Sequence, residues 1–130
     1  MPSIEHVALW ARDLDVLCLF YAKAFGATVG PLYENKAKGF KSRFLSFESG
    51  ARIEIMSTSQ LQPVEYEAGA QRMGLTHLAF SLGSESRVNE LTAKLKSEGA
   101  LLVDGPRHTG DGYYESVVLD PEGNRIELTV

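Results

Sequence analysis

The chain has 130 residues, of which 44% are hydrophobic and 23% charged, enough for one compact domain or two small fused modules with a hydrophobic core. Its formal net charge of −4 at pH 7 argues against binding to nucleic acid or to an anionic membrane surface, because both would repel an acidic protein. We therefore expect its partner to be a small molecule.

No segment of the sequence is typical of a membrane span or an export signal. The apolar runs are shorter than the roughly 20 residues that cross a bilayer, and the first residues lead straight into a predicted strand. These features favour the cytoplasm. The lone Cys18 lies in a predicted helix without a second cysteine to pair with, and we assign it no role.

The first half of the chain predicts a strand, a helix and three further strands. Alternating apolar residues predict a strand at 4–10, after which Asp13 caps a helix that ends at Gly26. The three following strands are predicted at 27–34, 40–48 and 51–57.

The second half repeats this order. A strand is predicted at 75–82, followed by a helix that begins after Ser84 and ends near Gly99. The last three strands are predicted at 100–105, 113–119 and 124–130, with a tight turn at Asp120-Pro121-Glu122-Gly123.

Together these elements predict an α+β fold of two tandem βαβββ modules, residues 1–58 and 75–130, joined by a linker at 59–74. The linker holds Pro63 and Gly69 and shows little periodicity, which is typical of a connection across the surface. We expect the two mixed sheets to curve around a cleft.

Each predicted module begins with a histidine in an apolar strand and ends with an Arg-Ile-Glu triplet. The first module has His6 and Glu54 and the second has His77 and Glu127, with nearly equal separations between histidine and glutamate. Because side chains alternate along a strand, all four are expected on the face that the helices do not cover. Taken singly, each is a polar residue facing solvent; the duplication favours a metal site.

Imidazole nitrogens and carboxylate oxygens are ligands that suit Zn²⁺, Ni²⁺, Co²⁺, Mn²⁺ or Fe²⁺. Four protein ligands in an octahedron leave two positions for water or substrate. The pattern therefore favours one divalent transition metal per site, in a site that performs chemistry.

The chain resembles the vicinal oxygen chelate superfamily along its whole length, a group that includes glyoxalase I, bleomycin-resistance proteins, fosfomycin-modifying enzymes and dioxygenases. The matching segments are Ile4-Glu5-His6-Val7-Ala8, Gly74-Leu75-Thr76-His77-Leu78-Ala79-Phe80 and Asp120-Pro121-Glu122-Gly123-Asn124-Arg125-Ile126-Glu127-Leu128. The resemblance implies a glyoxalase-like fold and places His6, Glu54, His77 and Glu127 on the metal-ligand positions of glyoxalase I.

The four-ligand set implies a lyase or isomerase similar to lactoylglutathione lyase. Such enzymes abstract a proton next to a carbonyl group by way of a metal-stabilised enediolate. By resemblance, Glu127 is the first choice for the base and Glu54 the second. A homodimer is expected, with the cleft built either within one chain or across two.

One departure concerns the substrate. Bacterial glyoxalase I enzymes carry an arginine that holds a glutathione carboxylate where this chain has Trp10, and an asparagine where it has Thr58. An indole does not replace a bidentate guanidinium, so the expected substrate need not be linked to glutathione. Further substrate contacts are predicted at Arg43 and Glu115, which strand alternation places on the cleft face or leaves as solvated rim charges, and at Tyr113.

Two alternatives stay open. The first is a binding module of the bleomycin-resistance type, which sequesters a ligand with aromatic residues such as Trp10, Tyr66, Tyr113 and Tyr114. The second is a thiol transferase of the fosfomycin-resistance type, which uses three protein ligands and would leave Glu54 outside the metal site.

Overall fold

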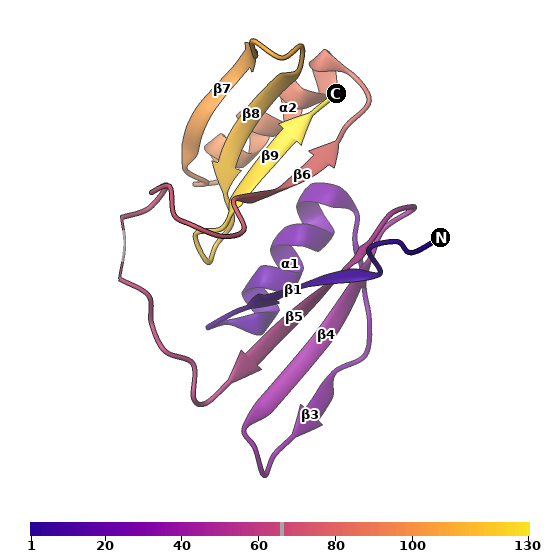
Figure 1. Ribbon diagram of the computed structural model, residues 1–130, viewed down its shortest axis with the longest axis vertical. Coiled ribbons are helices and arrows are strands. Elements are labelled where there is room, and N and C mark those ends of the chain that lie inside the picture. The colour runs from indigo at the N-terminus through magenta and orange to yellow at the C-terminus, as the bar shows by residue number, and fades with distance from the viewer. Residues whose placement is uncertain (66) are drawn as a thin grey trace. The chain divides into compact units, whose positions relative to one another are not determined.

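The computed structural model describes residues 1–65 and 67–130, and the chain divides into two compact units, Met1–Val64 and Glu65–Val130. Tyr66, which the sequence places among the candidate aromatic residues and within the expected linker, lies outside the described residues. Within the described residues, each unit combines a mixed sheet with a helix (Figure 1). The predicted α+β fold of two tandem modules is confirmed.

The first unit has its strands in the order β1-β5-β4-β2, and β3 pairs with β4. Its elements are β1 (His6–Trp10), α1 (Leu14–Phe25), β2 (Thr28–Val29), β3 (Tyr33–Asn35), β4 (Phe40–Ser46) and β5 (Arg52–Thr58). The helix begins where the sequence predicts, because the Asp13 side chain accepts a hydrogen bond from the Val16 amide at 3.1 Å. It ends at Gly26, whose φ of 68° is the left-handed conformation of a helix C-cap.

The prediction of a single strand at 27–34 is wrong, because the structure has the two short strands β2 and β3 in this region. They are separated at Gly30-Pro31. The Gly30 amide donates to the Phe44 carbonyl at 2.8 Å, and a Cβ on Gly30 would lie 3.1 Å from that same oxygen. Pro31 then has no N–H to continue the ladder, so the chain leaves the sheet before pairing again.

The second unit has the strand order β6-β9-β8-β7. Its elements are β6 (His77–Ser81), α2 (Glu85–Ser97), β7 (Leu102–His108), β8 (Tyr114–Leu119) and β9 (Arg125–Thr129). The Ser84 hydroxyl caps α2 by accepting from the Arg87 amide at 3.2 Å. β7 runs three residues beyond the predicted end at 105, because register shifts in its pairing with β8 let the strand continue past Pro106.

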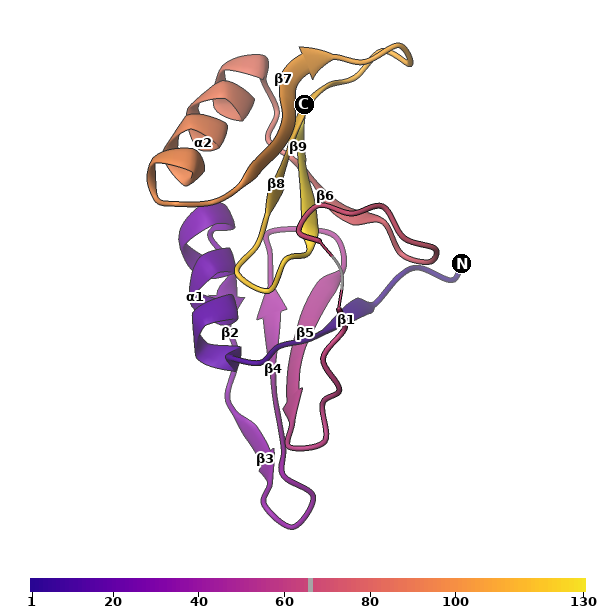
Figure 2. The ribbon, with the colours of Figure 1, turned by 90° about the vertical axis from the view of Figure 1, so that its left-hand side faces the viewer.

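Each helix covers one face of the sheet in its own unit. Figure 2 shows α1 lying along β4 and β5, and α2 lying along the sheet of β7, β8 and β9, as their contacts require. The side chains buried beneath the helices are apolar, among them Leu45, Ile53 and Ile55 in the first unit and Val118, Ile126 and Leu128 in the second. Burial of this apolar surface is the main term that stabilises each unit.

The first and last strands of each unit are parallel neighbours, and their register is the same in both units. His6 lies opposite Arg52 and Ala8 opposite Glu54. In the second unit His77 lies opposite Arg125 and Ala79 opposite Glu127. Opposite residues share a face of the sheet, so each histidine lies on the same face as the glutamate of its unit, away from the buried isoleucines.

No helix in the described part of the chain has the length and the hydropathy needed to span a membrane.

Burial of the inward face of α1 predicts a large difference between two leucines on the same helix. Leu17 is fully buried, whereas Leu19 is 52% exposed. We expect Leu17→Ala to lower the free energy of unfolding by about 2–5 kcal/mol and Leu19→Ala by less than about 0.5 kcal/mol, measured by urea denaturation. Equal losses for the two variants would contradict the observed packing of α1.

Candidate functional site

The structure brings each candidate histidine close to the candidate glutamate of its own unit. The His6 Nε2 atom lies 3.8 Å from Oε1 of Glu54, and the His77 Nε2 atom lies 3.1 Å from Oε2 of Glu127. The side-chain exposures also match, at 38% and 17% for the first pair and 37% and 16% for the second. The two units thus hold nearly equivalent pairs of one imidazole and one mostly buried carboxylate.

The geometry of both pairs fits two ligands of one metal ion. Nitrogen and oxygen ligands lie about 2.1 Å from a transition metal, which puts two adjacent ligands about 3.0 Å apart in an octahedron and about 3.4 Å apart in a tetrahedron. The 3.1 Å distance of the second pair lies within this range, and the 3.8 Å distance of the first pair would have to shorten by about 0.4 Å to reach it. Within the described part of the chain, no three His, Cys, Asp or Glu side chains are grouped as a metal site. Each unit therefore brings together one imidazole and one carboxylate, and no larger group of such side chains that could hold a metal among its described residues.

Two side chains, Glu5 and Phe44, contact the ring of His6, and neither contact is predicted from the sequence. The Glu5 Oε1 atom lies 3.2 Å from His6 Nδ1, and the Phe44 ring packs edge to face against the imidazole with centroids 5.3 Å apart. Arg52 donates from Nε to Glu5 Oε2 at 2.7 Å and also from Nη2 to Oε1. This bidentate hydrogen bond from Arg52 lowers the pKa of the Glu5 carboxyl to about 2. Glu5 is therefore ionised at neutral pH.

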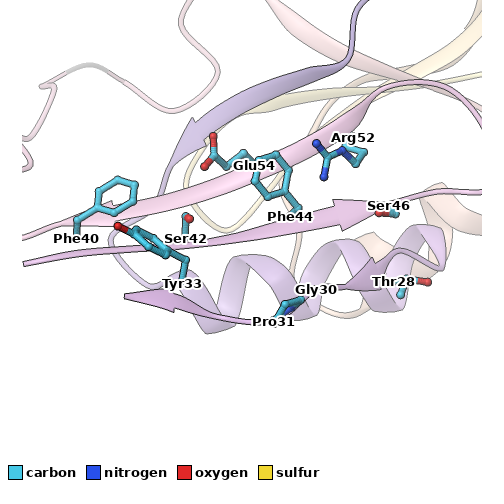
Figure 3. A pocket seen from close by; sticks show the side chains of 10 residues that line it. All are labelled: Thr28, Gly30, Pro31, Tyr33, Phe40, Ser42, Phe44, Ser46, Arg52 and Glu54. Carbon is cyan, nitrogen blue, oxygen red and sulfur yellow. The ribbon is translucent and has the colours of Figure 1, made fainter. Parts of the chain in front are cut away.

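A cleft of about 650 Å³ opens in the first unit beside Glu54. Its walls come from β2 to β5 and the connections between them, and Figure 3 shows the Phe44 ring between the Glu54 carboxylate and the Arg52 guanidinium. The lining residues are Thr28, Gly30, Pro31, Tyr33, Phe40, Ser42, Phe44, Ser46, Arg52 and Glu54. Aromatic and small hydroxyl side chains predominate.

The charge of Arg52 at this cleft is already paired with a carboxylate outside it. Its guanidinium is bound by Glu5 and lies 4.1 Å above the centre of the Phe44 ring. Glu54 adds a second carboxylate at the same end of the cleft. An anionic ligand would therefore meet the Glu54 carboxylate and a guanidinium whose charge is balanced by Glu5, which favours a ligand without negative charge.

Trp10 borders this cleft through an aromatic cluster. Its ring packs edge to face on Phe40, with centroids 6.4 Å apart, and Phe40 packs on Tyr33 at 6.0 Å. Phe40 and Tyr33 line the cleft. Trp10 itself is 47% exposed, so its indole is accessible beside the cleft.

In the second unit, Glu115 lies on the same face as Glu127. Val117 is opposite Glu127 in the β8–β9 pairing, and Glu115 is two residues from Val117 along β8. A hydrogen bond between the Glu115 and Glu127 side chains raises the pKa of Glu115 to about 7, and burial and the negative charge of Glu127 add to this effect. The second His–Glu pair thus has a further carboxyl group as its neighbour.

The placement of Arg43 on the cleft face is wrong. Arg43 lies opposite Ile55, so it shares the face that α1 covers, and its Nη1 donates to the Gly30 carbonyl at 2.8 Å. Burial raises the pKa of the Cys18 thiol on α1, and the nearby positive charge of Arg43 opposes this shift. The first-unit counterpart of Glu115 is the buried Ser42, because Phe44 lies opposite Glu54 as Val117 lies opposite Glu127.

Tyr113 lies one residue before β8 in the turn that follows β7, and it is 53% exposed. The turn is closed by a hydrogen bond from the Thr109 amide to the Tyr113 carbonyl at 2.8 Å. The hydroxyl of Thr109 accepts from the Tyr113 amide at 3.0 Å. The phenol is therefore exposed on an ordered turn of the second unit.

Residues 3–128 match the family model of the Glyoxalase/Bleomycin resistance protein/Dioxygenase superfamily. The chain belongs to this superfamily. The match covers both His–Glu pairs, the cleft of the first unit and the turn that carries Tyr113.

Individual members of the superfamily are similar over the whole chain. The YqjT protein of Bacillus subtilis strain 168 is 28% identical over 134 residues, covering 96% of each chain. A glyoxalase/bleomycin resistance protein/dioxygenase domain from Frankia sp. EAN1pec has a TM-score of 0.81 at 19% identity, covering 100% of this chain and 98% of that one. Glyoxalase I from Zea mays has a TM-score of 0.77 at 21% identity over 98% of this chain, which spans only 44% of the maize chain. These structural likenesses show the shared fold.

The elevated pKa of Glu115 predicts how the stability of the metal-free protein depends on pH. Because the folded-state pKa of about 7 is above the ordinary value of 4.5, the folded state binds more protons between these pH values. The contribution of Glu115 to stability is thus fully present below about pH 4.5 and is lost as the pH rises to about 7.

We expect Glu115→Gln to flatten this part of the stability profile, measured by urea denaturation of chelator-treated protein from pH 4.5 to 8. The matched control is Glu90→Gln, which changes an exposed glutamate on α2 of the same unit. An unchanged profile in Glu115→Gln would show that the two carboxyl groups do not share a proton.

Proposed function

We propose that this chain is a metal-dependent glyoxalase-like enzyme, a lyase or isomerase that removes a proton next to a carbonyl group of a small molecule. The observation that supports this proposal is the repeated pair of an imidazole and a carboxylate, His6 with Glu54 and His77 with Glu127. In the proposal, the two pairs supply four ligands to one divalent transition metal, Zn²⁺, Ni²⁺, Co²⁺, Mn²⁺ or Fe²⁺. The pairs come either from one chain or from two chains of a homodimer.

The metal, when bound, supplies positive charge that polarises a carbonyl oxygen and lowers the pKa of the adjacent C–H group. The protein supplies the base. By the resemblance to glyoxalase I, Glu127 is our first choice and Glu54 the second, and each is a mostly buried carboxylate beside a histidine. A glutamate that is also a metal ligand would act as the base only after leaving the metal. In the proposal, Glu115 contacts the substrate next to Glu127.

The cleft of the first unit favours a substrate with an uncharged part, which need not be linked to glutathione. Three aromatic and three small hydroxyl side chains line the cleft, and the one guanidinium among its lining residues is hydrogen-bonded to Glu5. The accessible indole of Trp10 beside it offers an aromatic surface and no charge. Trp10 is therefore proposed as a substrate contact of the apolar part of the ligand.

A binding module without catalysis is the second candidate, and the same cleft favours it. An aromatic-lined cleft of about 650 Å³ is sufficient to hold a small ligand. Such a module has no need for two matched His–Glu pairs, so its metal content distinguishes the two candidates. The homodimer and the cytoplasmic location expected from the sequence stay predictions.

Metal analysis of protein purified without chelator or affinity metal tests the proposal. We expect about one transition-metal ion per site in the wild type and a loss of that metal in the double variant Glu54→Gln, Glu127→Gln, because an amide is a much weaker ligand than a carboxylate. The control is the double variant Glu48→Gln, Glu90→Gln, which changes one exposed glutamate in each unit. A wild type that stays metal-free after incubation with zinc, nickel and manganese would favour the binding module.

Single variants distinguish the lyase or isomerase from a three-ligand thiol transferase. The four-ligand proposal expects metal affinity to fall in Glu54→Gln as it does in His6→Ala, His77→Ala and Glu127→Gln, whereas the transferase would retain its metal in Glu54→Gln. Metal affinity is measured by competition with a chromogenic chelator.

The assignment of the base is tested by activity. Glutathione hemithioacetals and then epimerisable acyl thioesters are the first substrates to assay, with proton abstraction followed as exchange in deuterated water. Once a substrate is found, Glu127→Gln and Glu54→Gln are compared at metal concentrations that saturate both variants, so that their exchange rates differ only through the base. Under these conditions Glu127→Gln is expected to lower the exchange rate by about 10²–10⁴-fold, the usual contribution of a general base. An unchanged exchange rate in Glu127→Gln would indicate that Glu54, and not Glu127, is the base.

A further inference from the structure

The imidazole of His6 is contacted on three sides within the first unit. Its Nδ1 atom faces Glu5 Oε1 at 3.2 Å, and its Nε2 atom faces Glu54 Oε1 at 3.8 Å. The Phe44 ring packs against it at an interplanar angle of 82°. The orientation of this ring is therefore set by a carboxylate at each nitrogen and an aromatic side chain between them.

Glu5 is itself held in place by Arg52. The guanidinium donates to both carboxylate oxygens of Glu5, from Nε at 2.7 Å and from Nη2. The Arg52 amide also donates to the Glu5 carbonyl at 2.9 Å. Because the same guanidinium lies over the Phe44 ring, the side chains of Glu5, Arg52 and Phe44 support one another around His6.

The chemistry of these groups selects one form of the imidazole. An ionised carboxylate only accepts hydrogen bonds, so the contact between Glu5 and Nδ1 requires the proton of the neutral ring to be on Nδ1. Nε2 then carries a lone pair, which is the form that binds a metal.

We propose that Glu5, clamped by Arg52, is a positioning residue that holds His6 in the Nδ1–H tautomer with Nε2 directed to the side of Glu54. The effect of Glu5 on metal affinity rests on the proposed function, whereas its effect on the tautomer of His6 does not. The Glu5 side chain is 60% exposed. Without the hydrogen bonds from Arg52, this carboxylate would be mobile, and water would compete with it for the hydrogen bond to His6.

Among the described residues of the second unit there is no equivalent clamp. The residue before His77 is Thr76, so no carboxylate is at the position that matches Glu5. Arg125, which lies opposite His77 as Arg52 lies opposite His6, instead donates from Nη1 to the Gly69 carbonyl at 2.7 Å. His77 therefore serves as an internal reference in every experiment on His6.

The tautomers are measured by long-range proton–nitrogen NMR of chelator-treated protein at about pH 8.5, where histidine is neutral. We expect His6 to be in the Nδ1–H form in the wild type. In Glu5→Ala it should shift toward the Nε2–H form, which neutral histidine prefers in water, while His77 stays unchanged. Glu5→Gln should largely retain the wild-type tautomer, because its amide oxygen still accepts from Nδ1.

Two further variants make the test specific. Thr76→Ala removes the side chain at the matching position of the second unit and is expected to leave the His6 tautomer unchanged. Arg52→Lys keeps the positive charge but loses the bidentate fork, so it should give a smaller shift of the His6 tautomer than Glu5→Ala. A His6 ring that stays in the Nδ1–H form in folded Glu5→Ala protein would overturn the proposal.

Zinc affinity provides the second measurement, by competition with a chromogenic chelator. Loss of a residue that orients a metal-binding histidine usually lowers metal affinity by about 10–100-fold, and we expect Glu5→Ala to fall in this range. A shifted tautomer with unchanged zinc affinity would overturn the role in metal binding. A wild type that binds none of zinc, nickel and manganese would overturn the proposed function, and the tautomer measurement would still decide the role of Glu5.

Discussion

The parallel pairing of the first and last strands in each unit is the constraint on which both candidate half-sites depend. Parallel strands keep their residues in a fixed register, so a histidine that begins β1 or β6 lies two positions from the glutamate of β5 or β9 on the same face. The other face of each pair is apolar and buried under a helix. A register shift of one residue would turn the glutamate into the core.

The sequence is sufficient to predict the strands and helices that carry the two His–Glu pairs. These elements follow from the alternation of apolar residues and from helix-capping residues, which are signals between residues close together in the chain. Asp13 and Ser84 cap their helices as predicted, and the glycines after the helices end them. In each of the four strands that carry a repeated histidine or glutamate, alternation predicts which side chains lie on the same face as that residue. The family match over residues 3–128 agrees with the resemblance that these segments carry. The roles of the individual site residues stay proposals, since they depend on a metal and a substrate.

The features that the sequence did not predict depend on register and on contacts at strand ends. Strand alternation predicts Arg43 on the cleft face together with Glu115, whereas the hydrogen-bonded register makes Ser42 the counterpart of Glu115 and turns Arg43 toward α1. Glu5 was missed because it precedes β1, and alternation would place its side chain away from His6. Only the chain path outside the strand lets its carboxylate reach both His6 and Arg52.

The two His–Glu pairs have the same donor types but different surroundings, and in the proposed enzyme this difference suits a reaction that removes one particular proton. Each pair joins one imidazole to one carboxylate, at 3.8 Å in the first unit and 3.1 Å in the second. The neighbours differ: a charged clamp and an aromatic cleft adjoin Glu54, whereas a second carboxyl group, Glu115, adjoins Glu127. In the proposed enzyme, an apolar group of the substrate would favour the first unit, leaving the acidic C–H group to the second. Such asymmetry would fix the orientation of a bound carbonyl compound, which identical half-sites could not do.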